Sequence, residues 1–187
     1  MKSSNTDILI LPGHEGAGPQ HWQTRMASKL STARVIEQPD WFFPSLSDAI
    51  GEIVAAVRDA QRPIVFVAHS AGCTLLSHSI ASIAALGLQD RLRGAYLVAP
   101  PSESKLLTLA RMDPAMAMMP RNPLPFPSLL VASSNDPFSN MEESAGLALA
   151  WGSLLVEAGD AGHINTASGH GPWPEGMMRF AGFLTKL

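Results

Sequence analysis

The sequence predicts an α/β fold in which a mostly parallel sheet of about six strands is covered by helices on both faces. Short apolar runs that each end at a turn rich in Gly, Pro, Ser or Asn are typical of buried parallel strands. Four such runs span residues 8–11, 64–68, 95–99 and 129–132. Between them, segments with apolar residues at helical spacing span 20–30, 46–60, 72–86 and 140–151. This alternation of strands and helices favours a parallel sheet.

Three weaker elements complete the predicted fold. We expect short strands at 34–37 and 153–157 and a last helix at 175–186. In open parallel sheets, the loops that follow the carboxyl ends of the strands carry the functional groups. The candidate functional residues should therefore lie in those loops.

Residues 100–127 interrupt the alternation. This stretch of 28 residues contains seven of the 15 prolines and four of the nine methionines, so it is too rich in proline for a long helix. It is either a plain surface connection or a short lid with an adaptable apolar wall. The wall would consist of Met112, Met116, Met118 and Met119.

The composition fits a single domain over residues 1–187. Acidic and basic residues are interspersed and the net charge is −3, which argues against nucleic acid or an anionic membrane as partner. The one cysteine, Cys73, precludes an intramolecular disulfide, and no Cys/His cluster has the spacing of a metal site. The N-terminus lacks a signal-peptide pattern, and no apolar run approaches the roughly 20 residues that span a bilayer. We therefore expect a cytoplasmic protein.

Residues 64–72, with the sequence Ile-Val-Phe-Val-Ala-His-Ser-Ala-Gly, predict a strand that runs into a tight turn and then a helix. The related pattern Gly-x-Ser-x-Gly holds a nucleophilic serine at strained backbone angles, so small residues must flank it. Ala68, Ala71 and Gly72 meet that demand, although alanine replaces the first glycine. Ser70 is therefore the candidate nucleophile. The alternative is an ordinary strand–helix turn with Ser70 as its N-cap.

A nucleophilic serine needs a base to take its proton and an acid that fixes the tautomer of the base. In α/β folds that hold a nucleophilic serine in such a turn, the three residues follow along the chain in the order Ser, then Asp or Glu, then His. Asp136 lies in the loop after 129–132, and His163 follows six residues after Glu157, the end of a predicted strand. Alone, Asp136 would indicate a turn before Pro137, and His163 a surface histidine. Their order and their places after separate strands favour a Ser-Asp-His triad.

Other residues compete for these roles. His170 is the main rival of His163, because one loop could bring either of them to Ser70. Asp160 and Glu157 are alternative acids, but both precede the histidine too closely to come from a separate strand. The remaining histidines precede the nucleophile, lie next to it or fall within the following helix, and are weaker candidates: His14, His21, His69 and His78.

The oxyanion of an acyl-transfer reaction needs two hydrogen-bond donors. We expect the backbone N–H of Ala71 and, from the glycine-rich loop after the first strand, the backbone N–H of His14. That loop lacks the spacing of a P-loop or a dinucleotide site. Most aromatic residues near the site should be packing residues, with one or two lining an acyl pocket. This aromatic set is Trp22, Trp41, Phe42, Phe43, Phe138 and Trp173, and the pocket candidates are Trp22, Phe138 and Trp173.

Several segments together resemble the small serine hydrolases similar to retinoblastoma-binding protein nine and its bacterial relatives. They are Pro12-Gly13-His14 with His21-Trp22, and residues 68–72, 134–138, 162–165 and 171–176, the last of which resembles the bacterial branch. The resemblance covers nearly the whole chain, implies an α/β-hydrolase fold without a large cap, and favours His163 over His170. Relatives often carry two consecutive aspartates where this chain has Asn135-Asp136, which leaves Asp136 as the acid there. The Leu-x-Cys-x-Glu segment that links the animal member to retinoblastoma protein is absent, so that partner is not implied.

We therefore expect hydrolysis of small carboxylic esters or amides through an acyl-enzyme. Ser70 would attack, His163 would accept and return the proton, and Asp136 would stabilise the imidazolium. This chemistry requires no metal or organic cofactor. The alternative is an interaction protein that keeps the hydrolase scaffold with little turnover, which exposed aromatic and methionine segments would favour. The sequence predicts neither a protein partner nor an oligomeric state.

Overall fold

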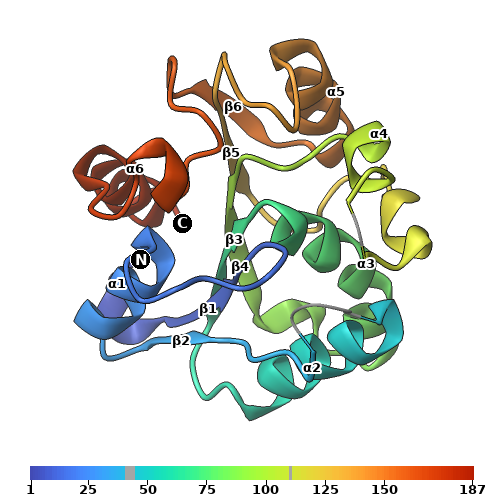
Figure 1. Cartoon of the computed structure of the whole chain (residues 1–187). Helices are drawn as coiled ribbons and strands as arrows, with labels where there is room; N and C mark the ends of the chain where they lie inside the picture. Colours follow the sequence, from blue (N-terminus) through green and yellow to red (C-terminus); the bar gives the residue numbers. More distant parts are fainter. Residues whose placement is uncertain (41–44, 110) are drawn as a thin grey trace.

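The computed structural model describes residues 1–40, 45–109 and 111–187. Its centre is a sheet of six strands in the order β2-β1-β3-β4-β5-β6 (Figure 1). The strands are β1 (Asp7–Leu11), β2 (Ala33–Val35), β3 (Ile64–His69), β4 (Leu92–Val98), β5 (Ser128–Ala132) and β6 (Leu154–Glu157). Every neighbouring pair is parallel, which confirms the predicted sheet.

Helices cover both faces of the sheet, as predicted (Figure 1). On one face α1 (Trp22–Lys29) and α6 (Pro174–Leu184) pack against the strands through Met26 and Phe180. On the other face lie α2 (Leu46–Asp59), α3 (Ala71–Ala85) and α5 (Met141–Trp151). Each of these five helices begins and ends within two residues of its predicted range, because capping residues such as Ser45 and Asn140 mark where two of them begin.

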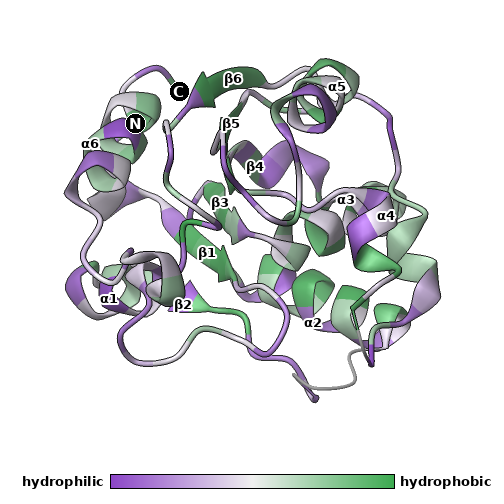
Figure 2. Cartoon of the chain, turned by 45° about the horizontal axis from the view of Figure 1, so that its top comes forward, coloured by the Kyte–Doolittle hydropathy of each residue, from purple (hydrophilic) through white to green (hydrophobic). Residues whose placement is uncertain are grey.

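The central strands β1 and β3 are apolar over most of their length because both of their faces are covered. All residues of β1 and β3 are buried, whereas the edge strand β6 leaves Leu154 and Glu157 exposed. Figure 2 shows β1 and β3 as hydrophobic segments between the helical layers. This burial explains why these strands read as continuous apolar runs and not as alternating patterns.

The strand order reverses next to β1, and this reversal positions the site. From β1 the chain passes to β2 on one side and later to β3 on the other. Leu11 and Ala68 are partners at the carboxyl ends of β1 and β3. In open α/β sheets, ligands bind at such a topological switch point. The loop after β1 and the turn after β3 meet at this place.

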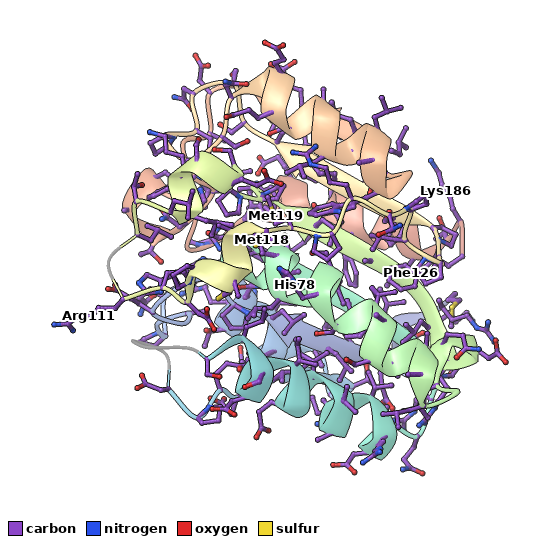
Figure 3. The ribbon with its side chains drawn as sticks, turned by 90° about the vertical axis from the view of Figure 1, so that its right-hand side faces the viewer. His78, Arg111, Met118, Met119, Phe126 and Lys186 are labelled. Carbon is purple, nitrogen blue, oxygen red and sulfur yellow. The ribbon has the colours of Figure 1, made fainter. Side chains whose placement is uncertain are left out.

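The proline-rich segment 100–127 contains only two short helical elements among its described residues, α4 (Glu103–Leu106) and η3 (Pro114–Ala117). It packs over α3, where Thr74 Oγ1 donates to Met119 Sδ at 3.3 Å and the ring of His78 contacts the carbonyl of Met116. Figure 3 shows His78 and Met119 on this side of the molecule, with Met118 beside them. Met116 and Met119 are buried and Met118 is 80% exposed, so part of this segment packs onto the core and the rest lies at the surface, without forming a large cap.

None of the described helices is both long enough and apolar enough to cross a membrane.

Candidate active site

Ser70 occupies the strained turn between β3 and α3. Its backbone angles are φ 52° and ψ −128°, a conformation that residues with a side chain rarely adopt. The Ser70 N–H donates to the carbonyl of Val98 at 2.9 Å, which fixes the turn against β4. A Cβ atom on Gly72 would lie 2.4 Å from the carbonyl oxygen of Leu11, so glycine is required there. The turn therefore presents the Ser70 hydroxyl at the carboxyl edge of the sheet.

The structure brings Ser70, His163 and Asp136 into one chain of hydrogen bonds. Ser70 Oγ lies 2.8 Å from His163 Nε2, and His163 Nδ1 lies 2.9 Å and 3.0 Å from the two carboxylate oxygens of Asp136. The side chain of Asp136 is only 2% exposed. Because an ionised carboxylate only accepts hydrogen bonds, this contact places the proton on Nδ1 and turns the Nε2 lone pair toward the serine. The arrangement can remove a proton from Ser70.

Asn135 connects the loop of the acid to the loop of the histidine. Its Oδ1 accepts hydrogen bonds from Gly162 N–H at 2.6 Å and from Ser133 Oγ at 3.0 Å. Ser133 Oγ in turn accepts from Ala161 N–H at 2.9 Å. These bonds fix the backbone just before His163. In the sequence Asn135 stands out only as a departure from a pair of aspartates, which gives no signal of this role.

The rival residues lie elsewhere. His170 Nδ1 contacts Ser168 Oγ at 3.2 Å, and its ring stands edge-on to Trp173 at 6.0 Å between centroids. Asp160 accepts a hydrogen bond from Ser134 Oγ, and Glu157 is exposed at the end of β6. Of the competing residues, none is in the hydrogen-bond chain of Ser70.

Two further imidazoles, those of His21 and His69, form a cluster with His163. The ring centroids of His21 and His69 are 5.0 Å apart, and those of His69 and His163 are also 5.0 Å apart. Burial and the neighbouring His163 lower the pKa of His21 to about 4. Burial, His163 and His21 hold the pKa of His69 well below its usual range. Both rings are therefore neutral at physiological pH. No group of three or more His, Cys, Asp or Glu in the described parts of the chain is arranged to hold a metal ion.

Hydrogen bonds from α1 hold this cluster. The Nδ1 atom of His21 accepts from Gln23 N–H and caps the helix, and Gln23 Nε2 donates to the carbonyls of Leu11 and Val67. Since those carbonyls belong to β1 and β3, Gln23 ties α1 to the strand ends that form the site. A glutamine within a helical pattern gives no sequence signal for this contact.

The loop after β1 lies directly against Ser70. A Cβ atom on Gly13 would be 2.8 Å from Ser70 Cβ and 3.3 Å from Ser70 Oγ. His14 follows Gly13 and lines the same cleft as Ser70, and Ala71 is the first residue of α3. Among the loop and cap hydrogen bonds of the described residues, neither His14 N–H nor Ala71 N–H is a donor. Both of these backbone N–H groups lie in segments that adjoin Ser70, where they could donate to a bound acyl oxygen.

An open cleft of about 780 Å³ lies above the serine. Its lining includes Ser70, His163, Leu109, Arg111 and Phe138. The ring of Phe138 packs on the imidazole of His163 with 4.5 Å between centroids, so this pocket candidate does lie at the cleft.

The other two pocket candidates lie in the core. Trp22 is 3% exposed, and its Nε1 donates to the carbonyl of Ile164 at 2.9 Å. Trp173 is 6% exposed and packs against Trp22 and Tyr96. Both tryptophans therefore support the histidine loop from below, because α1 and α6 bring them together behind it. The remaining aromatic candidates, Trp41, Phe42 and Phe43, lie outside the described residues.

The chain matches the serine hydrolase family model over residues 8–182. The chain belongs to the serine hydrolase family. This confirms the resemblance to small serine hydrolases and shows that the protein is a hydrolase of the α/β type. No curated protein matches the sequence.

Solved structures of similar fold agree with this family. A putative YdeN-like hydrolase from Pectobacterium atrosepticum is 29% identical, with a TM-score of 0.82 over 97% of this chain and 91% of that one. The ydeN gene product of B. subtilis is 19% identical, with a TM-score of 0.74 over 97% and 99% of the two chains. Esterase 2 of Thermogutta terrifontis, in its form phosphonylated by cyclosarin, is 17% identical, with a TM-score of 0.69 over 100% and 85%. The serine hydrolase fold thus covers essentially the whole chain.

Proposed function

We propose that this serine hydrolase cleaves small carboxylic esters or amides through an acyl-enzyme, with Ser70 as the nucleophile. The supporting observation is the hydrogen-bond chain from Ser70 Oγ through His163 to the buried carboxylate of Asp136. A serine hydroxyl is a weak nucleophile, and a neutral imidazole at 2.8 Å is placed to accept its proton as it attacks.

In the first half of the reaction, Ser70 Oγ attacks the acyl carbon while His163 Nε2 accepts the hydroxyl proton. The imidazolium that forms is stabilised by Asp136 and then gives its proton to the leaving alcohol or amine. In the second half, His163 Nε2 accepts a proton from a water molecule whose oxygen attacks the acyl carbon, and it then gives that proton to Ser70 Oγ as the bond between Oγ and the acyl carbon breaks and the acid leaves. The proton count is thereby restored at the end of each cycle.

The negative charge on the acyl oxygen would be held by the backbone N–H groups of Ala71 and His14. The N-terminus of α3 points its partial positive charge toward the same place. Such preorganised donors commonly contribute about 10²–10³ in rate each. Phe138, packed on His163 at the cleft, would contact the bound substrate.

Labelling by a fluorophosphonate probe tests the assignment of the nucleophile. We expect the folded protein to be labelled at Ser70, and Ser70→Ala to lose both labelling and ester turnover by a factor of about 10⁴ or more while keeping its melting temperature. Ser31→Ala, at an exposed serine, is the matched control and should react as the wild type does. A folded wild-type protein that stays unlabelled at Ser70 would overturn the proposal.

The second hypothesis, an interaction protein with little turnover, receives less support. Its motivation is a methionine-rich segment, and Met116 and Met119 of that segment are buried against α3. A specific protein partner whose binding survives Ser70→Ala, in a chain without ester turnover, would favour it.

A further inference from the structure

A second, smaller pocket lies on the oxyanion side of Ser70. It shares Gly13 and His14 with the main cleft and is also lined by Ala71. Its remaining wall is formed by Gln38, Leu75, Met112 and Met116. Because the acyl carbonyl would sit between Ala71 and His14, the substituent next to that carbonyl would lie close to this pocket.

Buried polar atoms without a partner concentrate at this pocket. Gln38 is 8% exposed, and neither its Nε2 nor its Oε1 has a hydrogen-bond partner. His14 Nδ1 is likewise buried and unpaired. Of the four such side-chain atoms in the described part of the chain, these two lining residues therefore provide three. Native proteins pair nearly all their buried polar groups, so an unpaired primary amide at a pocket indicates a position that a water molecule occupies in the free protein and that a polar group of a ligand can take over.

The size and the walls of the pocket restrict the ligand. The free volume is about 10 Å³, close to the minimum that holds one water molecule. Leu75, Met112 and Met116 make the rest of the wall apolar, so an ammonium or a carboxylate would lose its hydration without a counter-charge. An amide offers one donor group and one acceptor, and a neutral hydroxyl is the smallest group that can use both.

We propose that this pocket selects short acyl groups that carry a hydroxyl near the carbonyl, and that Gln38 is the residue that recognises the hydroxyl. The inference rests on the proposed acyl-enzyme chemistry and names the acyl half of its substrate. The hydroxyl alone would enter the pocket and donate to Gln38 Oε1 or accept from Gln38 Nε2, while the carbon chain would stay at the junction with the main cleft, beside Gly13 and His14. The leaving group would lie in the larger cleft.

The position of Met112 and Met116 is held by an aspartate. Asp113 caps η3 through a hydrogen bond from Ala115 N–H, and its other carboxylate oxygen accepts from Leu46 N–H at 3.1 Å. The bond to Leu46 ties the segment between the two methionines to the N-terminus of α2. The pocket wall is thus fixed to the scaffold, as a selective pocket requires.

Competition between isosteric esters tests the inference. We would measure kcat/KM for the 4-nitrophenyl esters of 3-hydroxybutanoate and 3-methylbutanoate, which differ by a hydroxyl in place of a methyl. The wild type should prefer the hydroxyacyl ester by about tenfold or more, because a site built to hydrogen-bond a hydroxyl disfavours the analogue that lacks it. In Gln38→Met and in Gln38→Leu the preference should fall to about one. Gln89→Met, at an exposed glutamine that precedes β4, is the matched control and should keep the wild-type preference.

The melting temperature provides a second readout. Gln38→Met replaces an unpaired amide by an apolar group of similar length, so it should raise the melting temperature. A wild type that hydrolyses both esters equally, or a preference that survives Gln38→Met, would overturn this inference and leave the proposed function intact. If neither ester is hydrolysed and Ser70 stays unlabelled by the fluorophosphonate, the proposed function fails and this inference fails with it.

Discussion

The imidazole of His69 donates from Nε2 to the backbone carbonyl of His163 at 2.9 Å, although 94 residues separate the two in the chain. His69 precedes Ser70 directly, so the candidate nucleophile and the candidate base are tied together through a buried residue that also lines the cleft. Burial, His163 and His21 lower the pKa of His69 and outweigh the bond to this carbonyl, which by itself would raise it, so the ring stays neutral.

Substituting His69 should lower activity by displacing His163. In His69→Phe the ring size is nearly kept and the donor is lost, so we expect kcat to fall by about tenfold to a hundredfold, because small shifts of a catalytic base have effects of that size. His69→Gln, which restores an N–H donor, should recover part of the loss. The check is steady-state kinetics together with the rate of fluorophosphonate labelling, and an unchanged labelling rate in His69→Phe would contradict this role.

Gly13 should tolerate no side chain. In Gly13→Ala the added Cβ would lie 2.8 Å from Ser70 Cβ, so the turn or the loop must shift. We expect kcat/KM to fall by about tenfold or more with a smaller change in stability, since the shift falls on the reacting groups. Gly51→Ala in α2, where a Cβ meets nothing within 4 Å, is the matched control and should leave turnover unchanged. Equal activity of the two variants would refute the close approach.

Asn135 should be replaceable by aspartate but not by leucine. Asn135 acts as an acceptor for Gly162 N–H and Ser133 Oγ, and a carboxylate can accept both hydrogen bonds. Asn135→Asp should therefore keep kcat within a few-fold. Asn135→Leu removes the acceptor of the exposed bond from Gly162 N–H, so it should lower the free energy of unfolding by about 0.5–1.5 kcal/mol. Urea denaturation and ester turnover of the two variants check this, and a fully active, fully stable Asn135→Leu would disprove the connection.

The histidine cluster predicts a loss of stability in acid. Burial and His163 lower the pKa of His21 to about 4, whereas an unfolded histidine titrates near 6.5. Between these values the unfolded chain binds more protons, so the free energy of unfolding should fall as the pH drops from about 6.5 to about 4. His21 alone accounts for up to about 3 kcal/mol of this loss, and His69 adds to it in the same direction.

Urea denaturation at pH 7, 5 and 4 measures this dependence. His21→Asn keeps an acceptor for the helix cap and should flatten the decline, whereas His78→Asn, outside the cluster, should not. A wild-type stability that is constant over this range would show that the cluster does not resist protonation.

The sheet is predictable from the sequence because burial on both faces makes a strand continuously apolar. Parallel strands also bring their following loops to one edge, so the same pattern predicts that Ser70, Asp136 and His163 lie near one another. The start of β4 is the exception and lies three residues before its predicted position, since the exposed Arg93 and the following Gly94 interrupt its apolar run. The ends of Leu187 and Phe183 pack against Gly94, where a side chain would displace them.

The rest of the site depends on contacts between distant segments. In the sequence His69 resembles the variable residue of a turn and Trp22 a pocket residue, because a local pattern does not tell which face of a loop meets the core. The sequence does not predict the role proposed for Gln38, because that role depends on its buried amide having no hydrogen-bond partner in the folded chain. The cytoplasmic location and the single-domain organisation stay predictions.

Mass spectrometry of the protein quenched within the first turnover of 4-nitrophenyl acetate tests the central claim most directly. Acyl-enzyme chemistry predicts a burst of nitrophenol close to one per protein, an acetyl group on Ser70 in the quenched wild type, and neither in Ser70→Ala. A folded protein that turns over the ester with no acetyl group on Ser70, or a Ser70→Ala variant that turns it over at the wild-type rate, would contradict the account.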